Sequence, residues 1–145
     1  ALQAAVADGT VDCIVTDHAP HAAHEKDCEW EISYFGCIGL ETSLPLMVTN
    51  MVRTNKLSYT GLVRAMAVNP RRILRLEPVK IAAGYKADLT LFDPEKKVQI
   101  TTEYFESKSK NSAFIGAELY GVATDVFVDG KRVLANEVVV PGGEK

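Results

Sequence analysis

The sequence has few cysteines and histidines and no long apolar run, and each shortage excludes a class of protein. Its three cysteines lack Cys-x-x-Cys spacing, so a disulfide framework or a thiolate zinc site is not expected, and a reducing cytoplasm fits. No apolar stretch approaches the roughly 18 residues that cross a membrane, and no signal peptide is visible. The net charge of −3 leaves no basic footprint for nucleic acid. We therefore expect a cytoplasmic protein that binds neither membranes nor nucleic acid.

The three histidines all lie within residues 18–24, directly after a carboxylate that follows a short apolar segment. Residues 11–15, which are mostly apolar or β-branched and follow Asp8-Gly9, predict a buried parallel strand. Side chains at the carboxyl end of such a strand point into the mouth of an α/β barrel, where catalytic groups lie. Asp17 at that end suits a divalent metal such as zinc and also proton transfer. The alternative is that Asp17 only caps the next element.

Residues 18–39 form a predicted irregular stretch of a length that is usually functional or disordered in compact domains. The segment contains His21, Lys26, Trp30, Tyr34 and Phe35, a mixture that is typical of a binding lid. For Trp30 we expect an anchoring role in the loop. His18 is expected to support the site because it points away from it if Asp17 points inward.

The rest of the chain predicts helices first and strands afterwards. Apolar positions from Leu40 to Val52 follow one helix face, with Pro45 as a kink or a late start. Ser58 predicts the cap of a second helix. Asn69-Pro70 should stop this helix and restart a short turn, with Pro70 suited to a first helical position. Asp129-Gly130 between two β-rich arms predicts a type I′ hairpin. The basic stretch 107–110 is expected on the surface.

Several motifs together resemble the dihydroorotases, members of the cyclic amidohydrolase family of metal-dependent hydrolases. The resemblance covers nearly the whole chain, and its most specific part is the string Asp17-His18-Ala19-Pro20-His21, which hydantoinases and allantoinases vary. The other segments that carry it are Glu25-Lys26, Phe35-Gly36, Gly39-Leu40-Glu41-Thr42, and residues 68–74, 84–89 and 107–111.

The resemblance implies an α/β fold. Residues 1–77 would be the C-terminal part of a metal-dependent (β/α)8 TIM barrel, comprising its last strand and helices, with an active-site loop at residues 18–39. Residues 78–145 would form a small β-rich composite domain. A complete barrel needs roughly 250 residues, whereas this chain has 145, begins without Met and lacks the first-strand His-x-His pair of the resembling enzymes. We therefore expect a C-terminal fragment whose partner is the missing N-terminal half of the barrel.

The implied activity is the reversible hydrolysis of the cyclic amide of dihydroorotate to N-carbamoyl-L-aspartate in pyrimidine biosynthesis. By this resemblance, Asp17 would ligate Zn²⁺ and act as the catalytic acid and base. His21 would donate a hydrogen bond to the substrate carboxylate, and the backbone at Phe35 and Gly36 would complete that pocket. One or two zinc ions are implied, with most ligands upstream, so the fragment alone should be inactive and self-associating.

Two alternatives stay open. Another cyclic amidohydrolase, such as a hydantoinase or an allantoinase, is disfavoured by His21, because a donor there benefits a carboxylated substrate. A non-catalytic dihydroorotase-like subunit that holds a partner such as aspartate carbamoyltransferase would be distinguished by the metal-binding residues upstream. The presence of Asp17 and His21 favours an active parent.

Overall fold

The computed structural model describes residues 1–144, and its helices precede its strands, as the sequence predicts. The helical elements are α1 (Leu2–Asp8), α2 (Ala23–Lys26), α3 (Leu40–Met47), α4 (Tyr59–Val63) and α5 (Asn69–Ile73), with π-helical segments η1 (Val48–Val52) and η2 (Arg64–Val68). The strands are β1 (Leu89–Gln99), β2 (Glu118–Val128), β3 (Lys131–Ala135) and β4 (Val138–Glu144). They form one antiparallel sheet in the order β1-β2-β3-β4.

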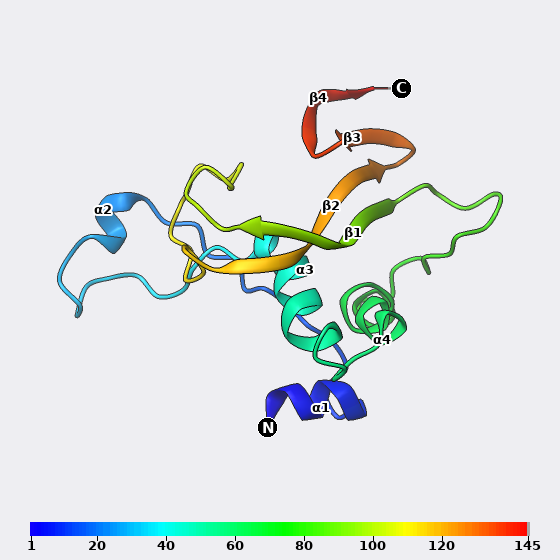
Figure 1. Cartoon of the computed structure of the whole chain (residues 1–145), viewed down its shortest axis with the longest axis horizontal. Helices are drawn as coiled ribbons and strands as arrows, with labels where there is room; N and C mark the ends of the chain where they lie inside the picture. The colour runs from blue at the N-terminus through cyan, green and yellow to red at the C-terminus, as the bar shows by residue number, and fades with distance from the viewer. Residues whose placement is uncertain (145) are drawn as a thin grey trace.

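The sheet and the helices pack against each other through β2. Figure 1 shows β1 and β2 lying over α3, and Gly121 of β2 approaches Val48 of η1 closely. Thr49 donates its hydroxyl to the Tyr120 carbonyl (3.4 Å) and accepts from the Tyr120 N–H (2.7 Å). A buried apolar cluster of Ile38, Ile100, Phe105 and Leu119 joins the end of the 18–39 loop to the sheet. The expected boundary at residue 77 stays a prediction.

The strand expected over residues 11–15 is not formed. Among residues 1–144 this segment has no neighbouring strand, and its Ile14 N–H donates to the Ala65 carbonyl (3.1 Å). A strand exists only through its ladder of backbone hydrogen bonds, so β-branched residues without a neighbouring strand stay extended but unpaired. The side chain of Val15 is accordingly 77% exposed.

The predicted helix over residues 40–52 is confirmed, and Pro45 lies inside it. A proline in a helix leaves the carbonyl four residues earlier without its N–H partner. Here that carbonyl belongs to Glu41 and accepts from the Tyr104 hydroxyl instead (3.0 Å). Burial, and then the negative charge of Glu41, raise the pKa of Tyr104, so its hydroxyl keeps its proton for this bond.

The Ser58 cap is confirmed, since the Ser58 hydroxyl accepts from the Gly61 N–H (3.1 Å). The expected restart at Asn69-Pro70 is confirmed, since α5 begins at Asn69 with Pro70 in its first turn, but the expected stop is not seen, because helical backbone continues from η2 into α5. The wider π-helical turn before Pro70 changes the local hydrogen-bond spacing, and a proline near the start of α5 needs no N–H partner.

The Asp129-Gly130 hairpin is confirmed. Both residues have positive φ (51° and 77°), and Val128 pairs with Lys131 across the turn. A second two-residue turn of the same kind, Asn136-Glu137 (φ 49° and 69°), joins β3 to β4. Asp93-Pro94 lies at a bulge within β1, where the register with β2 shifts.

Candidate functional site

The 18–39 loop brings its two ends together, so that residues near positions 19–21 lie beside residues 35–37. The Ala19 N–H donates to the Cys37 carbonyl (3.0 Å). At Gly36 the backbone has φ of +91°, and a Cβ there would lie only 2.8 Å from the Cβ of Ala19. Glycine is therefore required for both the conformation and the close approach. Apart from the short α2, the loop is irregular, as predicted.

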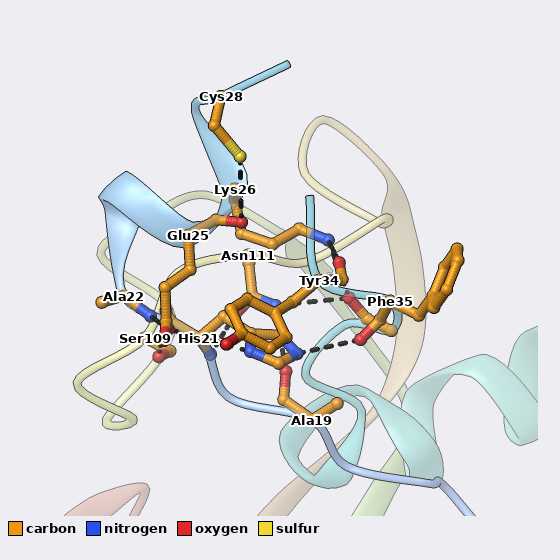
Figure 2. Close-up of polar contacts among 11 residues, drawn as sticks. Ala19, His21, Ala22, Glu25, Lys26, Cys28, Tyr34, Phe35, Ser109 and Asn111 are labelled. Atoms are coloured by element: carbon orange, nitrogen blue, oxygen red, sulfur yellow. Dashed lines mark hydrogen bonds and ion pairs between the residues drawn. The ribbon is translucent and has the colours of Figure 1, made fainter. Parts of the chain in front are cut away.

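His21 and Phe35 are in direct contact across this closure. His21 Nε2 lies 2.9 Å from the Phe35 carbonyl oxygen, and the imidazole stacks on the Tyr34 ring at 5.4 Å between centroids (Figure 2). A carbonyl can only accept, so Nε2 carries the proton of this bond. His21 Nδ1 faces the Glu25 carboxylate at 3.8 Å, which is an ion pair only when the ring is protonated.

The backbone at Phe35 and Gly36 offers unused donors. Within residues 1–144, neither N–H group donates a hydrogen bond, while the adjoining carbonyls of Phe35 and Gly36 are both engaged. Lys26 fixes this strip of backbone by donating its ammonium to the carbonyls of Tyr34 (2.6 Å) and Gly36 (3.2 Å). The arrangement leaves two backbone N–H groups beside an imidazole, which is a suitable set of donors for a carboxylate.

His18 joins the start of the 18–39 loop to its end. Its Nδ1 accepts from the N–H groups of Gly39 (3.1 Å) and Leu40 (3.3 Å), at the beginning of α3. Helix termini leave such N–H groups without partners within the helix, so the imidazole acts as a cap supplied from a distance. This contact anchors the chain immediately after Asp17.

Asp17 is exposed and has an uncommon backbone conformation, with φ of 45°. Its carboxylate accepts no hydrogen bond from the residues that the structure describes, so it is free to bind a cation or move a proton. A catalytic zinc ion needs about three protein ligands. No group of three His, Cys, Asp or Glu side chains suited to a metal occurs within residues 1–144. The residues described here therefore do not make a zinc site by themselves.

Sequence reasoning missed the contribution of Ser109 and Asn111 to this site. The Asn111 amide nitrogen donates to the Ala19 carbonyl (3.0 Å), and the Ser109 hydroxyl donates to the His21 carbonyl (2.7 Å). Stretch 107–110 is thus only partly a surface segment: Lys108 is exposed, but Ser109 is engaged. Residues 107–111 are one of the segments on which the family resemblance rests, and that membership was the sequence signal that could have identified Ser109 and Asn111.

The loop between α2 and α3 projects apolar side chains outward. Trp30 is 87% and Phe35 is 90% exposed, so the expectation that Trp30 anchors the loop is wrong. Polar contacts, not burial, fix this part of the chain. Among the described residues no helix is both long and apolar enough to traverse a bilayer.

Comparisons with known proteins agree with this arrangement of fold and loop. The Amidohydrolase family model matches residues 1–133, and the chain therefore belongs to that family. Among curated relatives, the dihydroorotases of Geotalea daltonii and Clostridium acetobutylicum are 45% and 43% identical over 92% of this chain.

The chain spans about a third of the length of the curated relatives it matches, 31% in both of these cases. Among solved structures, L-hydantoinase (dihydropyrimidinase) from Arthrobacter aurescens superposes with a TM-score of 0.89 at 30% identity, over 98% of this chain and 33% of that one. The helices and the sheet described above are thus the arrangement of part of an amidohydrolase.

Proposed function

We propose that this chain is the C-terminal part of a dihydroorotase, which interconverts dihydroorotate and N-carbamoyl-L-aspartate. The observation that carries the proposal is the contact of His21 with Phe35 at 2.9 Å, beside the free N–H groups of Phe35 and Gly36. These donors suit the carboxylate that distinguishes dihydroorotate from uncharged cyclic amides. The 41–45% identity to curated dihydroorotases supports it further.

In this proposal the substrate carboxylate takes the Nε2 hydrogen bond of His21 in exchange for the Phe35 carbonyl. The exchange is inexpensive because one charge-assisted hydrogen bond replaces a neutral one. The backbone N–H groups of Phe35 and Gly36 then bind the second carboxylate oxygen. Because Lys26 holds the carbonyl side of the same backbone, the N–H groups are fixed before substrate arrives.

Asp17 moves the proton of the reaction. In the ring-opening direction, water adds to the cyclic amide carbonyl, the ring C–N bond breaks, and the nitrogen must gain a proton. Asp17 takes the proton that water loses and returns it to that nitrogen, so the carboxylate is regenerated. Its exposure and its lack of a partner within residues 1–144 support this role.

Zinc belongs to the proposal through the family resemblance, with Asp17 as one ligand and most of the other ligands in a preceding part of the protein. When bound, zinc polarises a carbonyl and lowers the pKa of water. We propose one or two ions. Residues 1–145 alone should therefore bind zinc weakly and lack activity, and steady turnover by the purified chain would contradict this.

The proposal also includes the larger architecture. Residues 1–77 would belong to the (β/α)8 barrel, and residues 78–145 to a small β-rich domain. Exposed apolar side chains such as Trp30 and Phe35 support a homo-oligomer, with aspartate carbamoyltransferase as a further partner. The three cysteines are free, which supports a cytoplasmic location.

Two substitutions in the complete protein test the assigned roles. Asp17→Asn keeps the shape of the side chain but loses the base, so kcat should fall by about 10²-fold or more. His21→Ala should chiefly raise KM, by the factor that corresponds to roughly 1.5–3 kcal/mol for a charge-assisted hydrogen bond. Near-normal turnover of Asp17→Asn at unchanged zinc content would refute the mechanism.

A further inference from the structure

One side chain, that of Asn111, connects both ends of the 18–39 loop. Its amide nitrogen donates to the Ala19 carbonyl (3.0 Å) and lies within hydrogen-bond range of the Gly36 carbonyl (3.5 Å). Its amide oxygen accepts from the His21 N–H (3.4 Å). Figure 2 shows Asn111 beside the overlapping His21 and Tyr34 rings, above Ala19 and to the left of the Phe35 backbone. Both the nitrogen and the oxygen of the amide thus make hydrogen bonds to the segments that carry the candidate donors for a carboxylate.

The same segment also holds the other side of His21. Ser109 donates its hydroxyl to the His21 carbonyl (2.7 Å), while Asn111 accepts from the His21 N–H. The Asn111 carbonyl in turn accepts from the N–H of Ile38 (3.2 Å), a residue of the buried apolar cluster. The main chain of His21 is therefore tied on both faces to a segment about ninety positions away that is itself anchored to the core.

No apolar packing could replace these contacts at this place. Phe35 is 90% and Tyr34 is 58% exposed, so burial does not fix the backbone at residues 34–36, which lies outside the buried cluster that Ile38 joins. Hydrogen bonds from a rigidly anchored side chain can fix it, because each one constrains distance and direction. Asn111 thus helps to set the spacing between the His21 imidazole and the Phe35-Gly36 backbone, together with Lys26 and the Ala19–Cys37 backbone hydrogen bond.

We propose that Asn111, assisted by Ser109, is the positioning residue that holds His21 and the Phe35-Gly36 backbone at the separation that a substrate carboxylate requires. This inference rests on the proposed function, in which that carboxylate is bound there. Asn111 itself touches no reacting atom in this account. Its effect should appear in substrate capture far more than in the rate at saturation.

The test uses Asn111→Asp in the complete protein. The substitution keeps the size of the side chain and an acceptor for the His21 N–H. It replaces the donor to Ala19 and Gly36 with a negatively charged oxygen that repels both carbonyls. Loss of a part-buried hydrogen bond with one partner left unsatisfied corresponds to about a tenfold rise in KM for dihydroorotate. The value of kcat should stay within about threefold. An unchanged KM would overturn the proposal.

Asn50→Asp is the matched control. Asn50 also donates its amide N–H to a backbone carbonyl, that of Leu46 (3.0 Å). It lies in η1, and its exposed side chain has no hydrogen bond to the 18–39 loop. Its KM and kcat should match those of the unsubstituted protein. An equal rise of KM in both variants would mean that the effect is general destabilisation and would overturn the positioning role.

A double variant tests whether Asn111 acts through the donors it positions. In His21→Ala/Asn111→Asp, KM should rise by much less than the product of the two single effects, because there is no imidazole left to place. A rise equal to the product would contradict the proposal, since independent sites multiply.

A spectroscopic measurement separates this proposal from the proposed function. With ¹⁵N-labelled histidine, the ring resonances of His21 should move in Asn111→Asp and stay in place in Asn50→Asp, because the Nε2 contact to Phe35 is altered only in the first. If the unsubstituted protein does not turn over dihydroorotate, the proposed function fails while this measurement still decides the positioning role. Unmoved His21 resonances in Asn111→Asp would overturn it.

Discussion

Replacing Gly36 by alanine should open the closure on which the candidate site depends. The new Cβ would lie 2.8 Å from the Cβ of Ala19, whereas ordinary carbon contacts lie at about 3.5–4.0 Å. The two segments must therefore separate by roughly 1 Å. His21 Nε2 and the Phe35 oxygen are 2.9 Å apart, and most of that shift would lengthen their distance beyond hydrogen-bond range.

Two physical effects contribute to the cost in stability. A left-handed conformation (φ of +91° here) costs a residue with a Cβ about 1–2 kcal/mol. Forcing an extra carbon into an occupied space costs about 1–3 kcal/mol. Gly36→Ala should therefore lower the free energy of unfolding by about 2–5 kcal/mol.

Matched variants separate the two effects in urea unfolding of the complete protein. Gly84 has nearly the same φ (+86°) but nothing within 4 Å of a built Cβ, so Gly84→Ala should show the conformational cost alone. The double variant Ala19→Gly/Gly36→Ala removes the clash. Its loss of unfolding free energy, measured against Ala19→Gly alone, should equal the smaller conformational cost seen in Gly84→Ala. The KM for dihydroorotate should rise in Gly36→Ala and recover in the double variant. If Ala19→Gly restores neither stability nor KM, the close approach is not what requires glycine.

Three further predictions concern stability. Gly121→Ala should cost about 2–5 kcal/mol in urea unfolding, because φ is +97° and the new Cβ would lie 2.7 Å from the Cβ of Val48; a neutral result would contradict the close packing of β2 on η1. Glu41→Gln should cost about 1.5–3 kcal/mol in the same assay, because the carboxylate accepts two backbone N–H groups (2.7 and 3.1 Å) after β1; an unchanged midpoint would count against this. The Arg132 guanidinium lowers the pKa of Asp125, so its stabilisation is present above the usual aspartate pKa of about 4 and is lost as pH falls below it. When the pH is lowered from 7 to 3, the free energy of unfolding should fall more in the unsubstituted protein than in Asp125→Asn. Equal falls in the two proteins would exclude this contribution.

The sequence predicted the elements whose causes are local. Ser58 accepts from the N–H three residues later, and Asp129-Gly130 adopts the two positive φ angles of a two-residue hairpin. In both cases the residue types and their immediate neighbours determine the conformation. The helix over residues 40–52 follows from apolar spacing in the same way.

Features that depend on distant partners could not be predicted. Pro45 is accommodated in α3 because the Tyr104 hydroxyl bonds the carbonyl that the proline leaves free. Residues 11–15 have the composition of a strand but no ladder partner among the residues described. The role of Asn111 depends on contacts with residues 75 to 92 positions earlier, and no local pattern records them.

The residues of the candidate site were predicted from the sequence, but their contacts were not. The resemblance named His21, Phe35 and Gly36, and the structure places His21 Nε2 at 2.9 Å from the Phe35 carbonyl and Gly36 against Ala19. It did not reveal that the His21 Nε2 proton is already used on the Phe35 carbonyl, since that follows from the folded loop. The roles of these residues and of Asp17 remain proposals.

The central claim is that this site selects a carboxylated cyclic amide. The most direct measurement is kcat/KM of the complete protein, loaded with zinc, for dihydroorotate and for a hydantoin that lacks the carboxylate, each repeated with His21→Ala. We expect strong preference for dihydroorotate, and a preference that falls by about tenfold or more in His21→Ala because the charge-assisted hydrogen bond is lost. Equal use of the two substrates, or a preference that His21→Ala leaves unchanged, would contradict the account.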